Sequence, residues 1–393
     1  MDPIRGSPRG LAHLAMAEIG QEARGDPCKR VSVRRLAISL VVIASALPSL
    51  WLTTSAAGAA CTDTLRITDD GTREDSWSGV SATSSTDAWA VGDVFGSHGG
   101  NHEIIGHWDG AAWRHSRPPD IRNQVELRAV EAISSTDAWA IGTIRPFHHH
   151  ERIAAYHWDG SVWSQTPTTH LFRSMQDVTA SGPNDVWMVG ISYHADGYYP
   201  RTMHWDGTSW TTVPNPLRLD RWTGLNAVDA AGPDDVWAVG SSLTEPVAIH
   251  WDGERWTSRP VPGSFGQRPA LFSVVTLSAS NAWAVGQDDN GATTLLEQWN
   301  GTSWVRRTPV AASGLSTAFR VSAGSPSDVW VVVNDHGHDV LMHFDGVYWS
   351  VHALPGTHDA AFVRDVTSLP AGQMFAVGGT GTGRTYALDR CVG

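Results

Sequence analysis

The chain has 393 residues, of which 41% are hydrophobic and 17% charged, a composition typical of a globular protein. From Cys61 onward it contains 21 Arg, no Lys and 36 Asp plus Glu, a formal charge of −15. Negative charge repels phosphate backbones and anionic lipids, which argues against nucleic acid as a partner and against adsorption to membranes. Twenty tryptophans, with abundant Val, Thr, Gly and Ser, predict an all-β protein built from repeats.

The first 60 residues have the order of a secretory signal peptide with an extended n-region. Residues 29–35 are basic, residues 36–52 are apolar, and a run of small residues follows. We expect this segment to be removed near Ala59 or Ala60, so that the mature protein is secreted. A membrane anchor is disfavoured, because the apolar stretch is short and contains Pro48.

Cys61 would be among the first residues after cleavage and could instead carry a lipid. A lipoprotein signal has Leu three residues before that cysteine, where this chain has Gly58. A cell-surface lipoprotein is therefore the alternative localisation, and a membrane is a partner only in that case.

Seven copies of one unit follow, each marked by an aromatic residue in a string such as DAWAVG. A valine precedes this aromatic residue by nine positions in every copy. The pairs are Val80 and Trp89, Val130 and Trp139, Val178 and Trp187, Val228 and Trp237, Val274 and Trp283, Val321 and Trp330, and Val366 and Phe375.

A second motif, HWDGxxW, marks the same units, with two aromatic residues five positions apart. These pairs are Trp108 and Trp113, Trp158 and Trp163, Trp205 and Trp210, Trp251 and Trp256, Trp299 and Trp304, and Phe344 and Trp349. Each unit divides into four short strands joined by turns rich in Asp, Asn and Gly, which is typical of a propeller blade. We therefore predict a single domain, residues 61–393, that forms a seven-bladed β-propeller of four-stranded antiparallel blades.

The seventh copy ends after its third strand, near Cys391. The strand-like segment Cys61–Ile67 is expected to supply the outer strand of the last blade and so to close the ring. Cys61 and Cys391 are the only cysteines that remain after cleavage, in a compartment where disulfides persist. We predict a disulfide between them.

The repeats resemble those of tryptophan-rich propeller proteins exported by actinobacteria and myxobacteria, in strings such as DVWAVG and HWDGTSW. The WDGxxW hairpin is also similar to the Asp-box of sialidase-like propellers, with one residue fewer between Asp and Gly, and the chain is distantly similar to kelch and galactose-oxidase-like propellers. This resemblance implies the fold and no particular activity.

The enzymatic labels attached to such propellers find little support in the residues. The copper site of galactose oxidase requires a cysteine crosslinked to a tyrosine, whereas both cysteines here have a role in the disulfide. The Arg-Ile-Pro string of sialidases, a GxSxG elbow and a P-loop are all absent from the sequence. No cofactor is expected.

Histidines and aspartates recur in the repeats, but their equivalents lie on different blades and cannot converge on one metal ion. We interpret the histidines as structural hydrogen-bonding residues and predict no metal site; they are His107, His157, His204, His250 and His343. We interpret the aspartates as turn caps; they are Asp87, Asp137, Asp185, Asp235 and Asp328.

Function is expected where the repeats differ, in the variable loops that share one face of the propeller. Their aromatic and charged side chains suit a sugar ring or a protein hot spot. The candidate ligand-binding residues are Arg145, His149, Tyr198, Tyr199, Arg201, Arg221 and Trp222.

These residues predict a non-catalytic extracellular binding module, monomeric, that recognises a glycan or a protein. The alternative is a secreted hydrolase or lyase acting on polysaccharide at the same face. Such chemistry needs two carboxylates, for which Asp196 and Asp220 are the candidates. A cell-surface structural protein is a third hypothesis.

Overall fold

The computed structural model contains two separate units, residues 1–57 and residues 58–393, and the fold described below belongs to the second. The segment predicted to be a signal peptide and Cys61 lie outside the described residues. The structure describes residues 64–67, 74–95, 101–116, 118, 124–146, 151–168, 174–194, 196–217, 222–263, 265–288, 291, 293–308, 316–335, 337–353, 361–370, 372–380 and 385–391.

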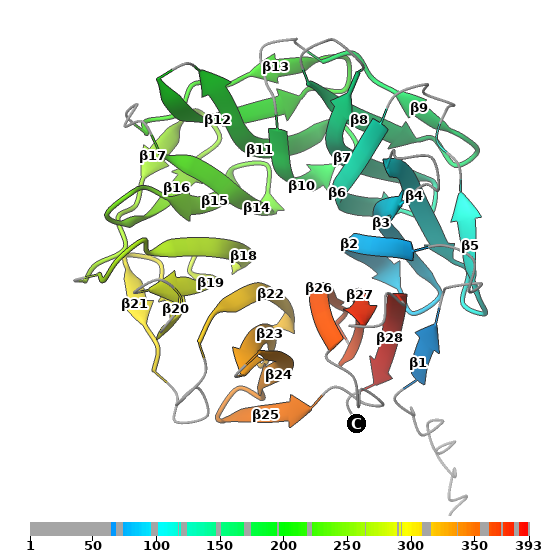
Figure 1. The fold of residues 1–393 in the computed structure, drawn as a ribbon. Coiled ribbons are helices and arrows are strands. Elements are labelled where there is room, and N and C mark those ends of the chain that lie inside the picture. Colours follow the sequence, from blue (N-terminus) through cyan, green and yellow to red (C-terminus); the bar gives the residue numbers. More distant parts are fainter. Residues whose placement is uncertain are drawn as a thin grey trace, which may run out of the picture. The chain divides into compact units, whose positions relative to one another are not determined.

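The described strands form seven four-stranded sheets, and in each sheet neighbouring strands are antiparallel (Figure 1). Six sheets are built from four strands that follow one another in the chain. Their strands are β2(Glu74–Ser84), β3(Asp87–Phe95), β4(Asn101–Trp108) and β5(Trp113–Ser116); β6(Gln124–Ser134), β7(Asp137–Arg145), β8(Arg152–Trp158) and β9(Trp163–Gln165); β10(Ser174–Gly182), β11(Asp185–His194), β12(Gly197–Trp205) and β13(Trp210–Thr212); β14(Gly224–Gly232), β15(Asp235–Ser241), β16(Pro246–Trp251) and β17(Trp256–Ser258); β18(Ala270–Ser278), β19(Asn281–Asp288), β20(Thr293–Trp299) and β21(Trp304–Arg306); and β22(Ala318–Ser325), β23(Asp328–Asp335), β24(His338–Phe344) and β25(Trp349–Ala353).

The remaining sheet joins the two ends of the described chain. It consists of β26(Ala361–Ser368), β27(Gln373–Thr380), β28(Thr385–Cys391) and β1(Thr64–Ile67). β1 is the outermost strand and pairs with β28 over four residues, with Thr64 opposite Asp389.

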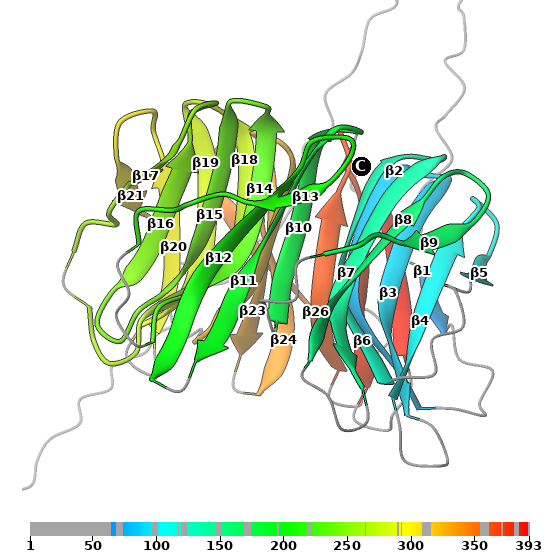
Figure 2. The same ribbon diagram turned by 90° about the horizontal axis from the view of Figure 1, so that it is seen from above.

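This arrangement corrects the prediction that the N-terminal strand closes the ring. Only six blades, not seven, are uninterrupted units of four strands, and β1 lies at an outer edge. The contacts that close the ring are made near the centre, where β2 packs against β26 and β27. The other inner strands contact one another in chain order, from β2 through β6, β10, β14, β18 and β22 to β26. Figure 2 shows the sheets standing side by side.

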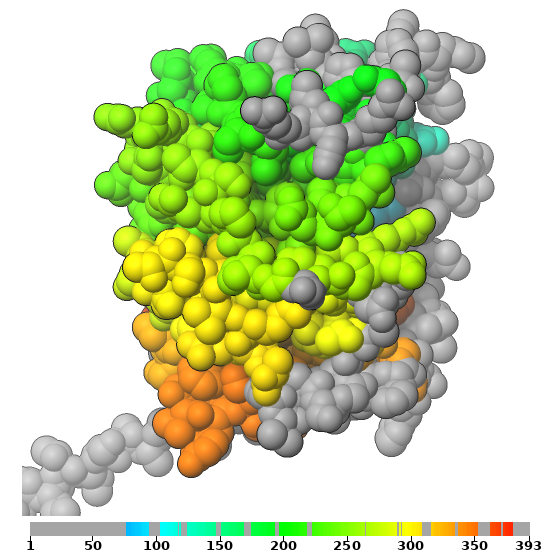
Figure 3. Space-filling model, turned by 90° about the vertical axis from the view of Figure 1, so that its left-hand side faces the viewer, coloured from blue at the N-terminus to red at the C-terminus, as the bar shows by residue number. Residues whose placement is uncertain are grey.

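Indole rings fill the space between neighbouring sheets. Trp89 of β3 packs against Trp158 and Trp163 of the next sheet, with ring centroids 5.1 Å apart in both pairs. The same three-ring contact recurs around Trp139, Trp187 and Trp237. Both landmark motifs of the sequence therefore lie at the junctions between blades, and Figure 3 shows these blades stacked closely in chain order, from green to orange.

The repeated histidines are confirmed as structural. Nε2 of His107 lies 2.7 Å from Oδ1 of Asp87, and its ring stacks on Trp89 at 4.1 Å. The interpretation of the aspartates as turn caps is wrong, because these carboxylates bind the histidine rings from across the sheet. The equivalent pairs are His157 with Asp137, His204 with Asp185, His250 with Asp235 and His343 with Asp328.

The turns are capped instead by the aspartate of the WDG motif. Oδ1 of Asp109 accepts hydrogen bonds from the backbone N–H groups of Ala111 and Ala112, at 3.0 and 2.9 Å. Gly110 has φ of 85°, a conformation that favours glycine. These features make the turn between the third and fourth strands nearly constant from blade to blade.

Candidate ligand-binding site at the mouth of the central channel

The first strand of every sheet contains a β-bulge, and the seven bulged residues belong to five residue types. The register skips one residue two positions before the landmark valine in all seven strands. A bulge of this kind turns one side chain away from the regular alternation of a strand. We call the seven bulged residues the bulge ring; they are Ser78, Arg128, Gln176, Asn226, Phe272, Phe319 and Arg364.

All seven side chains of the bulge ring line one cavity of about 670 Å³. Ser76, Asp93, Glu126 and Arg320 complete its wall. A volume of this size falls within the range of small-molecule and peptide pockets. Because one bulged residue comes from each sheet, the cavity lies where the inner strands converge, at the mouth of the central channel.

The bulge ring has an apolar sector and a polar sector. Phe272 and Phe319 come from neighbouring sheets, and their rings are nearly parallel, at 22°, with centroids 6.5 Å apart. Arg364 follows Phe319 in the order of the sheets, and Arg128 and Gln176 belong to the opposite side of the ring. The mouth thus offers an apolar wall beside hydrogen-bond donors.

An ion-pair network forms the rim next to Arg128. Glu126 accepts from Arg128 at 2.9 Å and from Arg145 at 2.7 Å, and Arg145 also contacts Glu151 at 3.1 Å. Asp93 is buried beside this network; burial raises its pKa, and the negative charge of Glu126 adds to the effect. Arg145, which the sequence placed in the site, therefore lies at the rim of the mouth.

The two arginines on the other side of the mouth differ in how they are held. Nε of Arg320 lies 3.3 Å from Oδ1 of Asp365, and Nη1 donates to the carbonyl of Phe319 at 2.9 Å. Arg364 is exposed, and its guanidinium carbon lies 4.6 Å from the ring centroid of Phe362. Among the residues that the structure describes, no carboxylate lies within ion-pair distance of Arg364. This guanidinium is the one best placed to receive an anion.

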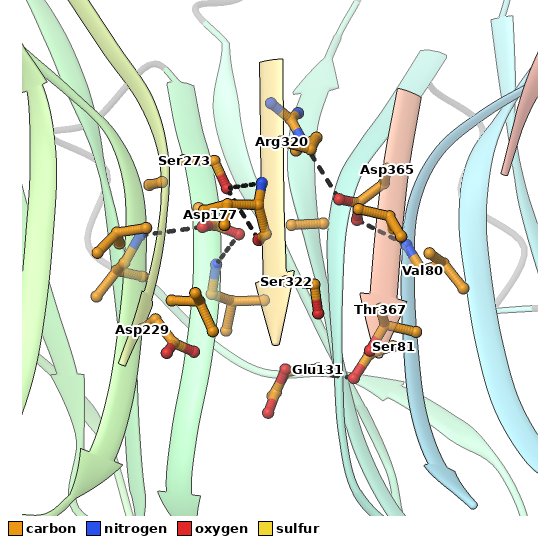
Figure 4. A pocket seen from close by; sticks show the side chains of 18 of the residues that line it. Val80, Ser81, Glu131, Asp177, Asp229, Ser273, Arg320, Ser322, Asp365 and Thr367 are labelled. Carbon is orange, nitrogen blue, oxygen red and sulfur yellow. Dashed lines mark hydrogen bonds and ion pairs between the residues drawn. The ribbon is translucent and has the colours of Figure 1, made fainter. Parts of the chain in front are cut away.

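Below the mouth the channel narrows to a cavity of about 130 Å³ lined by half-buried carboxyl groups (Figure 4). Each inner strand is the edge of its sheet, so its N–H groups need partners from the neighbouring blade. Asp177 supplies one by accepting from the N–H of Val228 at 3.0 Å, and Asp365 accepts from Val80 at 2.9 Å.

The same kind of bond links six of the seven blade junctions. The other four acceptor and donor pairs are Ser81 with Ala132, Asp229 with Thr276, Ser273 with Val321, and Ser322 with Ser368. At the remaining junction Nη1 of Arg128 donates to Oε1 of Gln176 at 3.1 Å. The polar side chains of the channel therefore hold the blades together.

Burial also shifts the acidity of the channel carboxyl groups. It raises the pKa of Asp177 to about 7 and that of Asp229 to about 6, against the opposing effect of the N–H groups that each accepts. The pKa of Glu131 is raised well above its usual range, first by burial and then by the charges of Asp229 and Asp177. These shifts have a structural cause in the packing of the inner strands.

Several residues predicted from the variable loops form a second cluster, on β12 and just before β14. The exposed Trp222 and the half-buried Tyr198 form an isolated backbone bridge, and their rings meet edge to face at 4.9 Å. The hydroxyl of Tyr199 donates to Oδ2 of Asp196 at 2.6 Å. Arg201 follows on the same strand, β12. Trp222 leads into β14, the strand that carries Asn226 of the bulge ring.

The other predicted residues lie outside the described part of the chain. These are His149, Arg221, Asp220 and Cys61. Cys391 ends β28, opposite Gln373 of β27 in the register, and its disulfide with Cys61 stays a prediction. Within the described ranges, no group of three or more His, Cys, Asp or Glu side chains could hold a metal ion. The described residues also contain no helix that is long and apolar enough to span a membrane.

The bulge ring was not predicted from the sequence, although a signal for it is present. The position two residues before the landmark valine holds five different residue types in the seven repeats, while the position before it is apolar in every repeat. A variable position next to a constant apolar one could have been recognised as a candidate for ligand contact. The prediction instead looked for variation only in the loops.

Comparisons with known proteins bear on the fold alone. No protein-family model matches the sequence, and no curated protein matches it. YCF48 bound to D1 peptide is 14% identical, with a TM-score of 0.58 over 84% of this chain and 97% of that one. Virginiamycin B lyase from Staphylococcus aureus, in a catalytically inactive form with quinupristin, is 10% identical, with a TM-score of 0.56 over 84% and 100%. The WD40 repeats of RRP9 are 12% identical, with a TM-score of 0.54 over 83% and 97%. The chain shares the β-propeller fold with these proteins.

Proposed function

We propose that the protein is a non-catalytic extracellular binding module, and that its ligand, a glycan or a protein, enters the mouth of the central channel. The bulge ring carries this proposal. Seven strands with the same backbone irregularity present seven side chains to one cavity, and those side chains belong to five residue types, Ser, Arg, Gln, Asn and Phe. Repetition serves the architecture, whereas variation at a shared position suits recognition of one particular ligand.

The proposal of binding without catalysis rests on how the carboxyl groups are used. Asp177 and Asp229, two channel carboxyl groups with a raised pKa, accept backbone N–H groups of the next blade, and this structural role explains their burial without a reaction. The candidate catalytic Asp196 is exposed and accepts from Tyr199. Binding is also a role that propellers take in the similar structures, one of which, YCF48, is bound to a peptide.

Binding at the mouth is tested by probing glycan and peptide arrays with the purified full-length chain and with its Arg364→Ala variant. The exposed Arg364 leaves the blades intact when truncated, so a ligand that uses the mouth should bind at least tenfold more weakly to the variant. The eluates are checked for cleaved products, and intact ligand supports binding without turnover.

Arg255→Ala is the matched control, because Arg255 is equally exposed but lies in a WDG turn away from the mouth. This variant should bind like the parent chain. A ligand that no longer binds the Arg255→Ala variant but still binds the Arg364→Ala variant would contradict the proposed location. Release of cleaved polysaccharide would favour an enzyme.

A further inference from the structure

The side chains that line the cavity indicate which chemical class of ligand it can bind. This inference rests on the proposed function, that a ligand enters the mouth. Arg364 is exposed, its guanidinium is held over Phe362, and no described carboxylate pairs with it. It stands on a protein whose residues from Cys61 onward carry a formal charge of −15. A cation that has no ion-pair partner among the described residues, on such a surface, suits a ligand with one or few negative charges, since a dense polyanion would be repelled by the rest of the molecule.

The anion has a defined depth at which it can bind. Below the mouth the channel narrows from about 670 to about 130 Å³, and Asp177, Glu131 and Asp365 line this lower part together with Arg128 and Arg320. Asp365 already engages Arg320, and Gln176 engages Arg128, so the level of the bulge ring, beside Arg364, is where an anionic group finds a guanidinium. At that level the adjacent part of the ligand meets the rings of Phe319 and Phe272.

The amide side chains of the bulge ring are already engaged with the protein. Oε1 of Gln176 accepts from Arg128, and its Nε2 donates to Ser174 at 2.8 Å. Nδ2 of Asn226 donates to the carbonyl of Leu271 at 2.7 Å. A sugar presents several hydroxyl groups that each need a partner on burial, and these amides have few positions left to offer. A ligand with one charged group and an apolar group makes better use of the cavity.

We propose that the mouth binds a peptide carboxylate that lies next to an apolar side chain. The carboxylate pairs with the guanidinium of Arg364, and the apolar side chain packs against Phe319 and Phe272. An Arg guanidinium and a carboxylate form a strong, directional pair in which two N–H groups can donate. A chain terminus and an acidic side chain both supply this chemistry.

Fluorescence anisotropy with three labelled hexapeptides tests the proposal on the full-length chain. The first ends in Leu-Phe with a free carboxylate, the second is its C-terminal amide, and the third is an amide with Glu immediately before Leu-Phe. We expect the first or the third to bind at least about tenfold more tightly than the second, the size of a charge-assisted hydrogen bond. Which of the two binds identifies the source of the carboxylate.

The Arg364→Ala variant should remove this preference, Arg364→Lys should retain part of it, and Arg255→Ala should leave it unchanged. Equal binding of all three peptides, or a preference that survives Arg364→Ala, would overturn the inference. A failure of all peptides, with a glycan whose binding is lost in Arg364→Ala, would overturn the peptide class and leave the proposed site standing. Ligands that are indifferent to Arg364 would overturn both.

Discussion

Two concentric regions of this propeller are built by opposite rules. At the blade junctions, indoles recur with almost the same contacts in successive blades, and a histidine–aspartate pair recurs within the sheets beside them. In the bulge ring the backbone repeats, whereas the side chains vary among five residue types. The proposed function assigns the repeated residues to stability and the variable positions at the mouth to recognition.

The largest effect on stability is expected from removing a junction indole. Trp237 is fully buried, with Trp299 and Trp304 at 4.7 and 4.8 Å. Trp237→Ala should lower the free energy of unfolding by about 3–5 kcal/mol, because it opens a cavity between two blades. Urea unfolding followed by tryptophan fluorescence measures this loss.

Trp222→Ala is the control for size, since Trp222 is 47% exposed on the variable face. Its cost should stay below about 1 kcal/mol. Equal destabilisation by the two substitutions would remove the distinction between the regions.

A smaller loss is expected from the bonds across the channel. Asp177→Ala leaves the N–H of Val228 without its acceptor at the junction of β10 and β14. A buried donor without a partner costs about 1–3 kcal/mol, so the free energy of unfolding should fall by that amount. The exposed Asp196→Ala is the comparison and should change it little.

The same carboxyl group should make stability depend on pH. Burial raises the pKa of Asp177 from 3.8 to about 7, so the folded protein holds this proton more tightly than the unfolded chain does. The stabilisation is complete below pH of about 4 and is lost as the pH rises through about 7.

Asp177→Asn should therefore flatten the dependence of the unfolding free energy on pH between about 4 and 7. Its side-chain oxygen can still accept from Val228, so the fold is kept. Urea unfolding across this pH range measures the slope. An unchanged slope in the variant would show that Asp177 does not titrate as the buried environment predicts.

The smallest effect is expected from replacing the His–Asp pair of one blade by the Gln–Asn pair found in another. The fifth complete blade has Gln298 donating to Asn281 at 3.2 Å, where the other five complete blades have His and Asp. The double variant His250→Gln with Asp235→Asn copies this pair and should lie within about 1 kcal/mol of the parent. Each single substitution should cost more than the pair of them, as measured by a double-mutant cycle. Additive losses would contradict the interpretation of the two pairs as equivalent.

The sequence predicted the blades well because their signals are local and repeated. The nine-residue spacing from Val228 to Trp237 reflects two paired strands, with Val228 opposite Ala238. The site was predicted less well. Arg145, Tyr198 and Trp222 were predicted as loop residues that share one face, and of these three only Arg145 joins the rim network at the mouth.

Ring closure and the bulge ring depend on contacts between distant parts of the chain. The packing of β2 on β26 cannot be derived from the pairing of β1 with β28, although both join the two ends of the propeller. The bulge leaves no spacing signal in this sequence, because every repeat has the extra residue at the same position of its first strand. The length of the repeat is therefore the same as it would be for regular strands of that length. Residues such as Phe319 and Arg364 therefore read as ordinary strand positions.

The most direct test of the central claim is site-specific photocrosslinking. A benzophenone amino acid at position 319, in the bulge ring, should crosslink a ligand selected from the arrays. The same group at position 348 should not, because Tyr348 is 74% exposed but lies in a constant turn between the third and fourth strands. Crosslinking at position 319 alone is the result that this account predicts. Crosslinking at position 348 and none at position 319 would place recognition on the repeated scaffold and contradict it.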